Sequence, residues 1–158
     1  MPNRRVLIVD DEPDLRWVLR GLLEDAGCTV AEDGVGAEAL LAIERELPDV
    51  VLSDVRMPRV TGTELLHELQ RTRPDLPVVL LSAVEDIATA VSAIRDGAFD
   101  YQQKPFDQER LLLSVTRAAE QHALRREVAA LRAGHGTAPG DFGDSKKARR
   151  LQQQVALV

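Results

Sequence analysis

The sequence predicts an α/β fold with a five-stranded parallel sheet at its centre. Five short apolar runs alternate with five segments of helical periodicity, and glycines and prolines separate them. All of these segments but the end of the last helix fit into about 120 of the 158 residues. Alternating strands and helices are typical of a parallel sheet that carries helices on both faces. Five such units suit an open, doubly wound sheet rather than an eight-stranded barrel.

The first part of the chain contains two strands and two helices. Arg5–Val9 is a short β-branched run and predicts a buried strand. Pro13 opens a helical pattern that keeps its leucines on one face and ends at Ala26, which a glycine follows. Cys28–Glu32 predicts the second strand. Two glycines then break the chain, and Ala37–Leu47 predicts the second helix.

The middle of the chain continues the same alternation. Val50–Leu52 predicts the third strand, and Thr63–Thr72 predicts a helix after a loop that contains proline and glycine. Val78–Leu81 predicts the fourth strand, because it is a short apolar run bounded by a proline turn. Asp86–Asp96 predicts a helix that a glycine ends, and Ala98–Gln102 predicts the fifth strand.

The last helix is expected to extend beyond the α/β domain. Its periodicity runs without a breaker from Asp107 to about Ala133. Four residues at the spacing of a coiled-coil seam predict a short dimerisation helix: Gln121, Leu124, Val128 and Leu131. The predicted organisation is a domain over 1–120, a linker helix over 121–133, a flexible glycine-rich linker over 134–143, and a last segment over 144–158.

Composition and charge narrow the function classes. The net charge is −6, and it divides into −10 over residues 1–120 and +4 over residues 121–158. The acidic part is a poor match for nucleic acid, which attracts basic surfaces. Cys28 is the only cysteine, so no intramolecular disulfide can form, and we expect it to be buried. No apolar run approaches a membrane span, so we expect a cytoplasmic protein without membrane contact.

Polar residues end or follow four of the predicted strands: Asp10 and Asp11, Asp54, Ser82, and Lys104. In an open parallel sheet, ligands bind beyond the carboxyl ends of the strands, so these side chains are expected to converge. Clustered carboxylates repel one another and favour a hard cation such as Mg²⁺. A lysine and a hydroxyl beside them could contact phosphoryl oxygens, and aspartate is a known nucleophile that forms an aspartyl phosphate.

Four motifs carry a resemblance to a known family: Val9–Glu12 (VDDE), Leu52–Pro58 (LSDVRMP), Leu80–Ala83 (LLSA) and Phe99–Phe106 (FDYQQKPF). Residues 1–120 resemble the receiver domain of two-component response regulators. The resemblance implies a flavodoxin-like sheet of order 2-1-3-4-5 and a cis peptide bond between Lys104 and Pro105. It also implies that Asp54 accepts a phosphoryl group from a sensor histidine kinase.

The resemblance assigns further roles around Asp54. Asp10 and Asp11 would help to bind Mg²⁺ together with Asp54 and the backbone carbonyl of Arg56. Two other residues would contact the phosphoryl group: Ser82 and Lys104. Ser82 and Tyr101 would form the switch that reports phosphorylation to the surface. The chain would then be a regulatory phosphoacceptor rather than an enzyme, with chemistry limited to its own phosphorylation and slow dephosphorylation.

Two segments resemble one class of response regulators. Arg16–Leu19 (RWVL) looks like regulators of the nitrogen-regulation, NtrC-like class. Gly143–Val158 resembles the first segment of the AAA+ domain in sigma-54-dependent activators, although the sequence contains no GxxxxGK phosphate loop, so residues 144–158 are expected to be either the start of such a domain or a tail helix. The resemblance implies a homodimer whose dimerisation changes on phosphorylation, and DNA binding only through a C-terminal domain outside this chain.

Three alternatives remain at this stage. A stand-alone receiver would act by docking to another protein and would be monomeric in both phosphorylation states. A phosphatase of the haloacid dehalogenase type also forms an aspartyl phosphate. That class has a DxD motif, with a second acid two residues after the nucleophile, and in this sequence Arg56 occupies that position. A flavin-binding protein of the flavodoxin type is disfavoured, because the clustered carboxylates would repel its phosphate.

Overall fold

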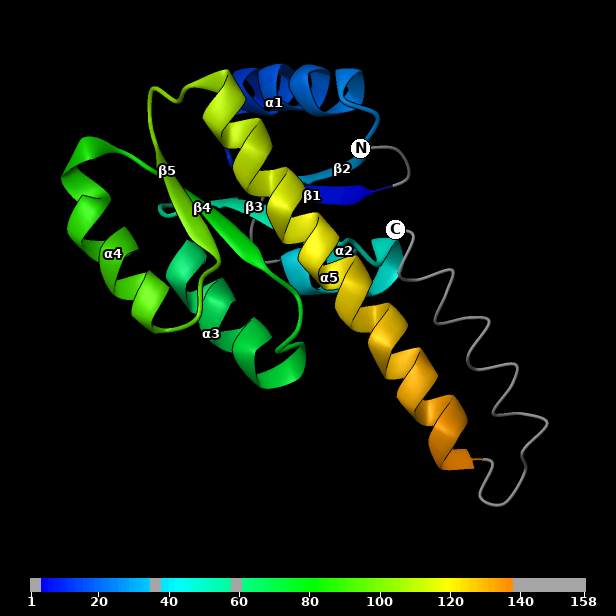
Figure 1. Cartoon of the computed structure of the whole chain (residues 1–158). Helices are drawn as coiled ribbons and strands as arrows, with labels where there is room; N and C mark the ends of the chain where they lie inside the picture. Colours follow the sequence, from blue (N-terminus) through cyan, green and yellow to red (C-terminus); the bar gives the residue numbers. More distant parts are fainter. Residues whose placement is uncertain (1–3, 35–37, 58–60, 138–158) are drawn as a thin grey trace. The chain divides into compact units, whose positions relative to one another are not determined.

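The computed structural model describes residues 4–34, 38–57 and 61–137, apart from the side chains of 133–137. Its centre is a five-stranded parallel sheet of order β2-β1-β3-β4-β5, which confirms the predicted fold class and strand order (Figure 1). The strands are β1 (Arg5–Val9), β2 (Thr29–Asp33), β3 (Val50–Asp54), β4 (Val78–Ser82) and β5 (Asp100–Gln103). The helices are α1 (Pro13–Asp25), α2 (Ala39–Glu46), α3 (Gly62–Thr72), the 3₁₀ helix η1 (Val84–Asp86), α4 (Ile87–Arg95) and α5 (Gln108–Thr137).

Two aliphatic clusters cover the two faces of the sheet. Leu7 and Val51 belong to one cluster, whereas Val6 and Leu52, their neighbours along the strands, belong to the other. This alternation follows from the period of two in a β-strand. Helices α2, α3 and α4 contribute to the first cluster, and α1 and the first turns of α5 contribute to the second. The sheet is therefore doubly wound, as predicted.

Most predicted elements lie within one or two residues of the observed ones. The fifth strand begins at Asp100 rather than Ala98, because the N–H of Ala98 donates to the carbonyl of Ala93 and closes the end of α4. The predicted helix 86–96 is preceded by η1, whose turn is closed by a bond from the N–H of Asp86 to the carbonyl of Ala83.

The chain divides into two compact units, Met1–Glu120 and Gln121–Val158. Helix α5 continues to Thr137, so residues 134–137, which were predicted to begin a flexible linker, are helical instead. A glycine costs a helix only about 1 kcal/mol relative to alanine, so a glycine by itself does not end a growing helix. The rest of the predicted linker and the segment 144–158 lie outside the described residues.

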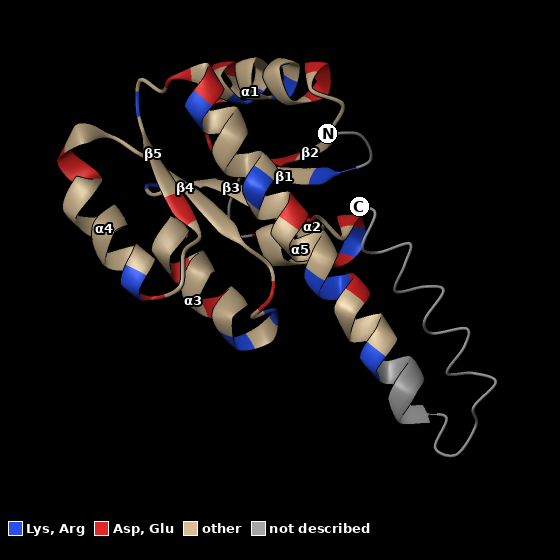
Figure 2. Cartoon of the chain, viewed as in Figure 1, with Lys and Arg blue, Asp and Glu red and all other residues tan. Residues whose placement is uncertain are grey.

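The described part of the second unit exposes both charged and apolar residues. All four residues of the predicted dimerisation seam are at least partly exposed. Leu124 is 51% exposed, and the other three are partly exposed: Gln121, Val128 and Leu131. Figure 2 shows basic and acidic residues intermixed along α5, without a stripe of one sign. The role of the seam in dimerisation stays a prediction.

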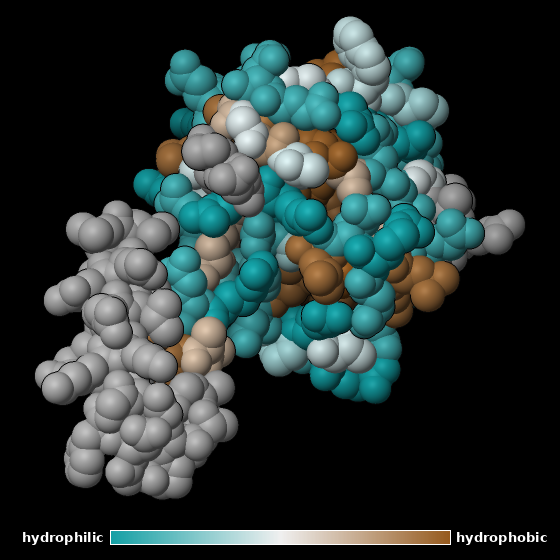
Figure 3. Space-filling view, turned by 90° about the vertical axis from the view of Figure 1, so that its right-hand side faces the viewer, coloured by the Kyte–Doolittle hydropathy of each residue, from teal (hydrophilic) through white to brown (hydrophobic). Residues whose placement is uncertain are grey.

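The described surface combines hydrophilic residues with small apolar patches. Figure 3 shows such patches among mostly hydrophilic side chains on one face. The most exposed large apolar side chains include Trp17 (77%) on α1 and Leu41 (68%) on α2. No helix in the described ranges is long and apolar enough to cross a membrane.

Candidate functional site

The carboxyl ends of the central strands bring the predicted site residues to one edge of the sheet. Asp10 follows β1, and Asp54 is the last residue of β3. Ser82 is the last residue of β4, and Lys104 follows β5. The parallel register pairs Asp54 with Leu81 and Ser82 with Gln103, so these strand ends lie level with one another. Polar residues scattered along the sequence thus share one location.

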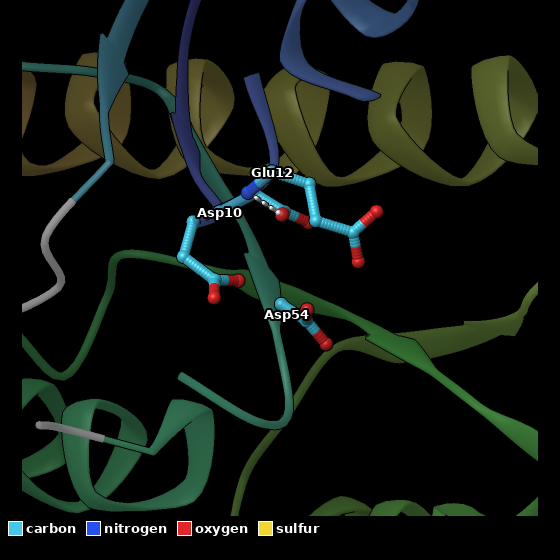
Figure 4. Close-up of side chains that lie close together, drawn as sticks. Asp10, Glu12 and Asp54 are labelled. Carbon is cyan, nitrogen blue, oxygen red and sulfur yellow. Dashed lines mark hydrogen bonds between the residues drawn. The ribbon is translucent and has the colours of Figure 1, made fainter. Parts of the chain in front are cut away.

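Four carboxylates form a cluster at this edge. One oxygen from each of Asp10, Asp11, Glu12 and Asp54 lies within 4.8 Å of the others. Figure 4 shows Asp10 and Glu12, from the loop after β1, beside Asp54 from β3, with the N–H of Glu12 donating to Oδ1 of Asp10 at 2.9 Å. Glu12 was not among the predicted site residues. Its position directly after Asp10 and Asp11 was the available signal.

Lys104 supplies a positive charge inside the cluster. Its Nζ donates to Oδ2 of Asp54 at 3.0 Å and lies 3.7 Å from Oδ2 of Asp10 and 3.6 Å from Oε1 of Glu12. The backbone N–H of Lys104 donates to the carbonyl of Ser82 at 2.7 Å, which ties the loop after β5 to β4. Burial lowers the pKa of Lys104, but the bond to Asp54 and the nearby carboxylates outweigh it, so the pKa is raised overall.

Asp10 is the most strongly perturbed acid of the cluster. Burial raises the pKa of Asp10 from 3.8 to about 6, and the charges of Asp54 and Glu12 act in the same direction. The N–H of Glu12 and the charge of Lys104 oppose this increase. Oδ2 of Asp10 is buried and has no hydrogen-bond partner. A buried carboxylate oxygen that lacks a donor, surrounded by other carboxylates, fits a hard divalent cation such as Mg²⁺.

The loop after β3 holds Asp54 from the other side. The N–H of Arg56 lies 3.3 Å from Oδ1 of Asp54 and donates to it. The guanidinium of Arg56 pairs with the buried carboxylate of Asp86 at 2.8 Å, a contact that sequence reasoning did not find. A Cβ atom at Gly62 would lie 2.3 Å from the carbonyl oxygen of Asp54, so only glycine allows α3 to begin there. An open pocket next to the cluster is lined by Asp11, Arg56, Met57 and Thr61.

The two predicted switch residues lie on neighbouring strands. Ser82 is fully buried, and its hydroxyl donates to the carbonyl of Ala83 at 2.9 Å. Tyr101 is half-buried and packs against the cluster that includes Leu80, its partner in the β4–β5 register. The peptide bond between Lys104 and Pro105 is cis, as the resemblance implied.

Comparison with known proteins assigns this arrangement to a family. Residues 6–116 match the family described as the response regulator receiver domain. The chain belongs to this family. It is 45% identical over 113 residues to the DNA-binding transcriptional regulator NtrC of Escherichia coli, a match that covers 72% of this chain and 24% of NtrC. The predicted resemblance to the NtrC-like class is therefore confirmed.

A second relative matches almost the whole chain. The C4-dicarboxylate transport transcriptional regulatory protein DctD of Pseudomonas aeruginosa is 40% identical over 161 aligned positions, which cover 98% of this chain and 34% of DctD. The chain thus spans between about a quarter and a third of the length of these curated relatives.

Solved structures agree with the assignment. The receiver domain of NtrX from Brucella abortus matches with a TM-score of 0.69 and 42% identity, covering 73% of this chain and 98% of that domain. A response regulator receiver domain protein from Clostridium thermocellum matches with a TM-score of 0.73 and 28% identity, covering 77% of this chain and 98% of that protein.

Proposed function

We propose that this receiver domain accepts a phosphoryl group on Asp54 from a sensor histidine kinase and thereby controls sigma-54-dependent transcription. The observation that carries the proposal is the position of Asp54, whose carboxylate belongs to the acidic cluster at the carboxyl edge of the sheet and accepts a hydrogen bond from the ammonium of Lys104. The names of the relatives support a role in transcription, because NtrC is described as DNA-binding and DctD as a transcriptional regulatory protein.

In the proposed transfer, a carboxylate oxygen of Asp54 attacks the phosphorus of a phosphohistidine. The new P–O bond forms as the P–N bond breaks, and the electron pair of that bond returns to the histidine nitrogen. The bond from Lys104 holds the carboxylate of Asp54 in place before the transfer, and the same ammonium would contact the phosphoryl oxygens after it. Ser82 lies at the end of the adjacent strand and would donate to the same group.

A divalent cation would be held by Asp10, Asp11, Asp54 and the backbone carbonyl of Arg56. When bound, Mg²⁺ supplies positive charge that offsets the negative charge on the transferred group. The residues of the chain itself would position Asp54, exclude competing groups and bind the phosphoryl oxygens. Such chemistry is regulatory rather than enzymatic, since the chain itself is the substrate and only slow hydrolysis returns it to the starting state.

The output proposed for the chain is a change in dimerisation. Ser82 and Tyr101 would relay phosphorylation to the surface, and the seam of α5 would pair two copies. DNA would be contacted through a C-terminal domain outside this chain. The curated relatives are longer than this chain, and such a domain would lie in their additional length. A cytoplasmic location fits this proposal, since the kinase domain and DNA are both found there.

The test is the intact mass after incubation with Mg²⁺ and a small phosphodonor, with light scattering on the same sample. A single phosphate adduct is expected in the wild type and in Asp96→Asn, a matched change at an exposed position after α4. The adduct should be absent in Asp54→Asn and in EDTA. Labelling of Asp54→Asn would refute the assignment of the acceptor. An adduct without any change in dimer population would favour a stand-alone receiver.

A further inference from the structure

We propose that Arg16 is a positioning residue for the proposed metal site and that its guanidinium holds the acidic loop Asp10–Glu12 in the shape that binds the cation. This inference rests on the proposed function, because it assumes that the cluster binds a divalent cation. Arg16 itself contributes no ligand. It would act through the backbone of the residues that do.

Arg16 joins the loop to two other elements. Its Nη1 donates to the backbone carbonyl of Asp10 at 2.5 Å, and its Nε donates to Oε1 of Glu32 on β2 at 3.0 Å. Its backbone N–H donates to the carbonyl of Glu12 at 3.1 Å, within the first turn of α1. Arg16 therefore binds the backbone of the acidic loop at both of its ends, Asp10 and Glu12, and links the loop to β2 through Glu32.

The loop needs such an anchor because its own charges oppose its shape. The carboxylates of Asp10, Asp11 and Glu12 lie close to each other and to Asp54. Like charges at such distances repel and would spread a loop that was fixed only by its side chains. The backbone of Asp10 is held instead, since its N–H donates to the carbonyl of Asp33 and its carbonyl accepts from Arg16. The groups around a metal ligand commonly set its orientation in this way.

A second observation shows that the fold leaves space for this guanidinium. A Cβ atom at Gly34, just after β2, would lie 2.7 Å from Nη1 and 3.0 Å from Cζ of Arg16. Any side chain at position 34 would displace the guanidinium. Because the displaced atoms are the far end of a flexible side chain, the backbone would not have to move. Gly34→Ala is therefore a way to disturb the Arg16 contact without changing Arg16.

Arg20 provides a matched control one helical turn later on α1. Its Nε also donates to Glu32, at 2.5 Å to Oε2, and its Nη1 pairs with Glu24 at 3.1 Å. Both arginines thus share the charge, the helix and the partner Glu32, whereas the contact with the acidic loop described above belongs to Arg16. A difference between the two substitutions isolates that contact from the loss of a positive charge on α1.

The experiment titrates Mg²⁺ alone into the full chain by isothermal titration calorimetry. Substitutions of residues that orient metal ligands typically weaken metal binding about 10–100-fold, so we expect Arg16→Gln to raise the Mg²⁺ dissociation constant about tenfold or more. Gly34→Ala should raise it in the same direction, and Arg20→Gln should leave it within about twofold, because only Arg16 supports the ligands themselves. Arg16→Lys keeps the charge without the two-pronged fork and should not restore binding.

Urea unfolding in EDTA supplies the readout that separates positioning from stability. Arg16→Gln and Arg20→Gln are expected to have similar midpoints, since each loses a partly exposed ion pair to Glu32. Equal losses of Mg²⁺ affinity in the two variants, or full affinity in Arg16→Lys, would overturn the positioning role in favour of a charge effect. A wild-type chain that neither binds Mg²⁺ nor becomes phosphorylated would instead refute the proposed function.

Discussion

Strand β3 contains, within five residues, an apolar region that burial stabilises and a polar region that burial destabilises. Val50, Val51 and Leu52 are fully buried aliphatic side chains that belong to the two core clusters. Ser53 and Asp54, which follow directly, are buried as well, but they are polar and end at the acidic cluster. Burial stabilises the first three residues and penalises an ionised carboxylate. The buried aliphatic residues in the interior of the sheet thus offset the cost of burying polar and charged residues at its carboxyl edge.

The same contrast appears at β1. Its last four residues, Val6–Val9, are buried aliphatics, and the next residue is the fully buried Asp10 with its raised pKa. A protein selected only for stability would not place several acids around one buried carboxylate. Such a cluster is expected of the proposed site for a cation and a phosphoryl group.

Truncation in the interior should have the largest effect on stability. Leu52→Ala removes a fully buried side chain two residues before Asp54 and is expected to lower the free energy of unfolding by about 2–5 kcal/mol. Urea denaturation followed by circular dichroism measures this loss. Leu41→Ala, at a side chain that is 68% exposed, is the control and should change stability by about 0.5 kcal/mol or less. Similar losses in the two variants would remove the distinction between interior and surface.

Neutralising Asp10 at the carboxyl edge should instead raise the free energy of unfolding. The raised pKa of Asp10 means that the folded chain binds a proton more tightly than the unfolded chain between pH 3.8 and about 6. The contribution of Asp10 to the free energy of unfolding therefore falls as the pH rises through this range and remains low above it. In EDTA at pH 7–8, Asp10→Asn is expected to be more stable than the wild type by on the order of 3 kcal/mol.

The measurement is the difference in unfolding free energy between Asp10→Asn and the wild type across pH 4 to 8. This difference should grow with pH and level off above about 6, where Asp10 is ionised in both the folded and unfolded states of the wild type. Saturating Mg²⁺ should reduce it, because the wild type keeps all of the proposed ligands and would gain more stability from the cation than the variant. A difference that is constant with pH would show that Asp10 titrates normally.

A methyl group at the start of α3 should show how tightly the edge is packed. Gly62→Ala places a Cβ against the carbonyl oxygen of Asp54 and is expected to cost about 1–3 kcal/mol of stability. Gly21→Ala is the matched control, since a Cβ at Gly21 within α1 has no atom within 4 Å, and it should stabilise the chain by up to about 1 kcal/mol. Melting temperatures of the two variants should therefore move in opposite directions.

The smallest expected effect concerns the cap of the same helix. The hydroxyl of Thr61 accepts from the N–H of Glu64 at 3.1 Å and caps α3. Thr61→Ala should lower the free energy of unfolding by about 1 kcal/mol, whereas Thr61→Ser keeps the acceptor and should stay close to the wild type. Chemical denaturation of both variants measures the difference. An alanine variant as stable as the serine variant would show that the cap contributes nothing.

The sequence was sufficient to predict what depends on period and topology. Apolar runs located β1, β3 and β4, and the rule that parallel strands end at one edge brought Asp10, Asp54 and Lys104 together. Contacts that depend on side-chain direction were not predictable. The pairs Arg16 with the Asp10 carbonyl and Arg56 with Asp86 join residues whose separation along the chain carries no signal. The roles of Ser82, Tyr101 and the seam stay predictions.

The all-parallel order of the sheet also has a consequence for how the chain folds. Arg5 of β1 pairs with Thr29 of β2, and Val6 pairs with Val50 of β3, so a crossover segment separates each strand from its partner. None of the five described strands can form a hairpin with the one before it. Folding must therefore close long loops before any pairing is rewarded, which slows folding relative to a helical bundle of equal size. During synthesis, β1 would be made before β2 and β3, and both of its edges would be paired only after β3 had been made.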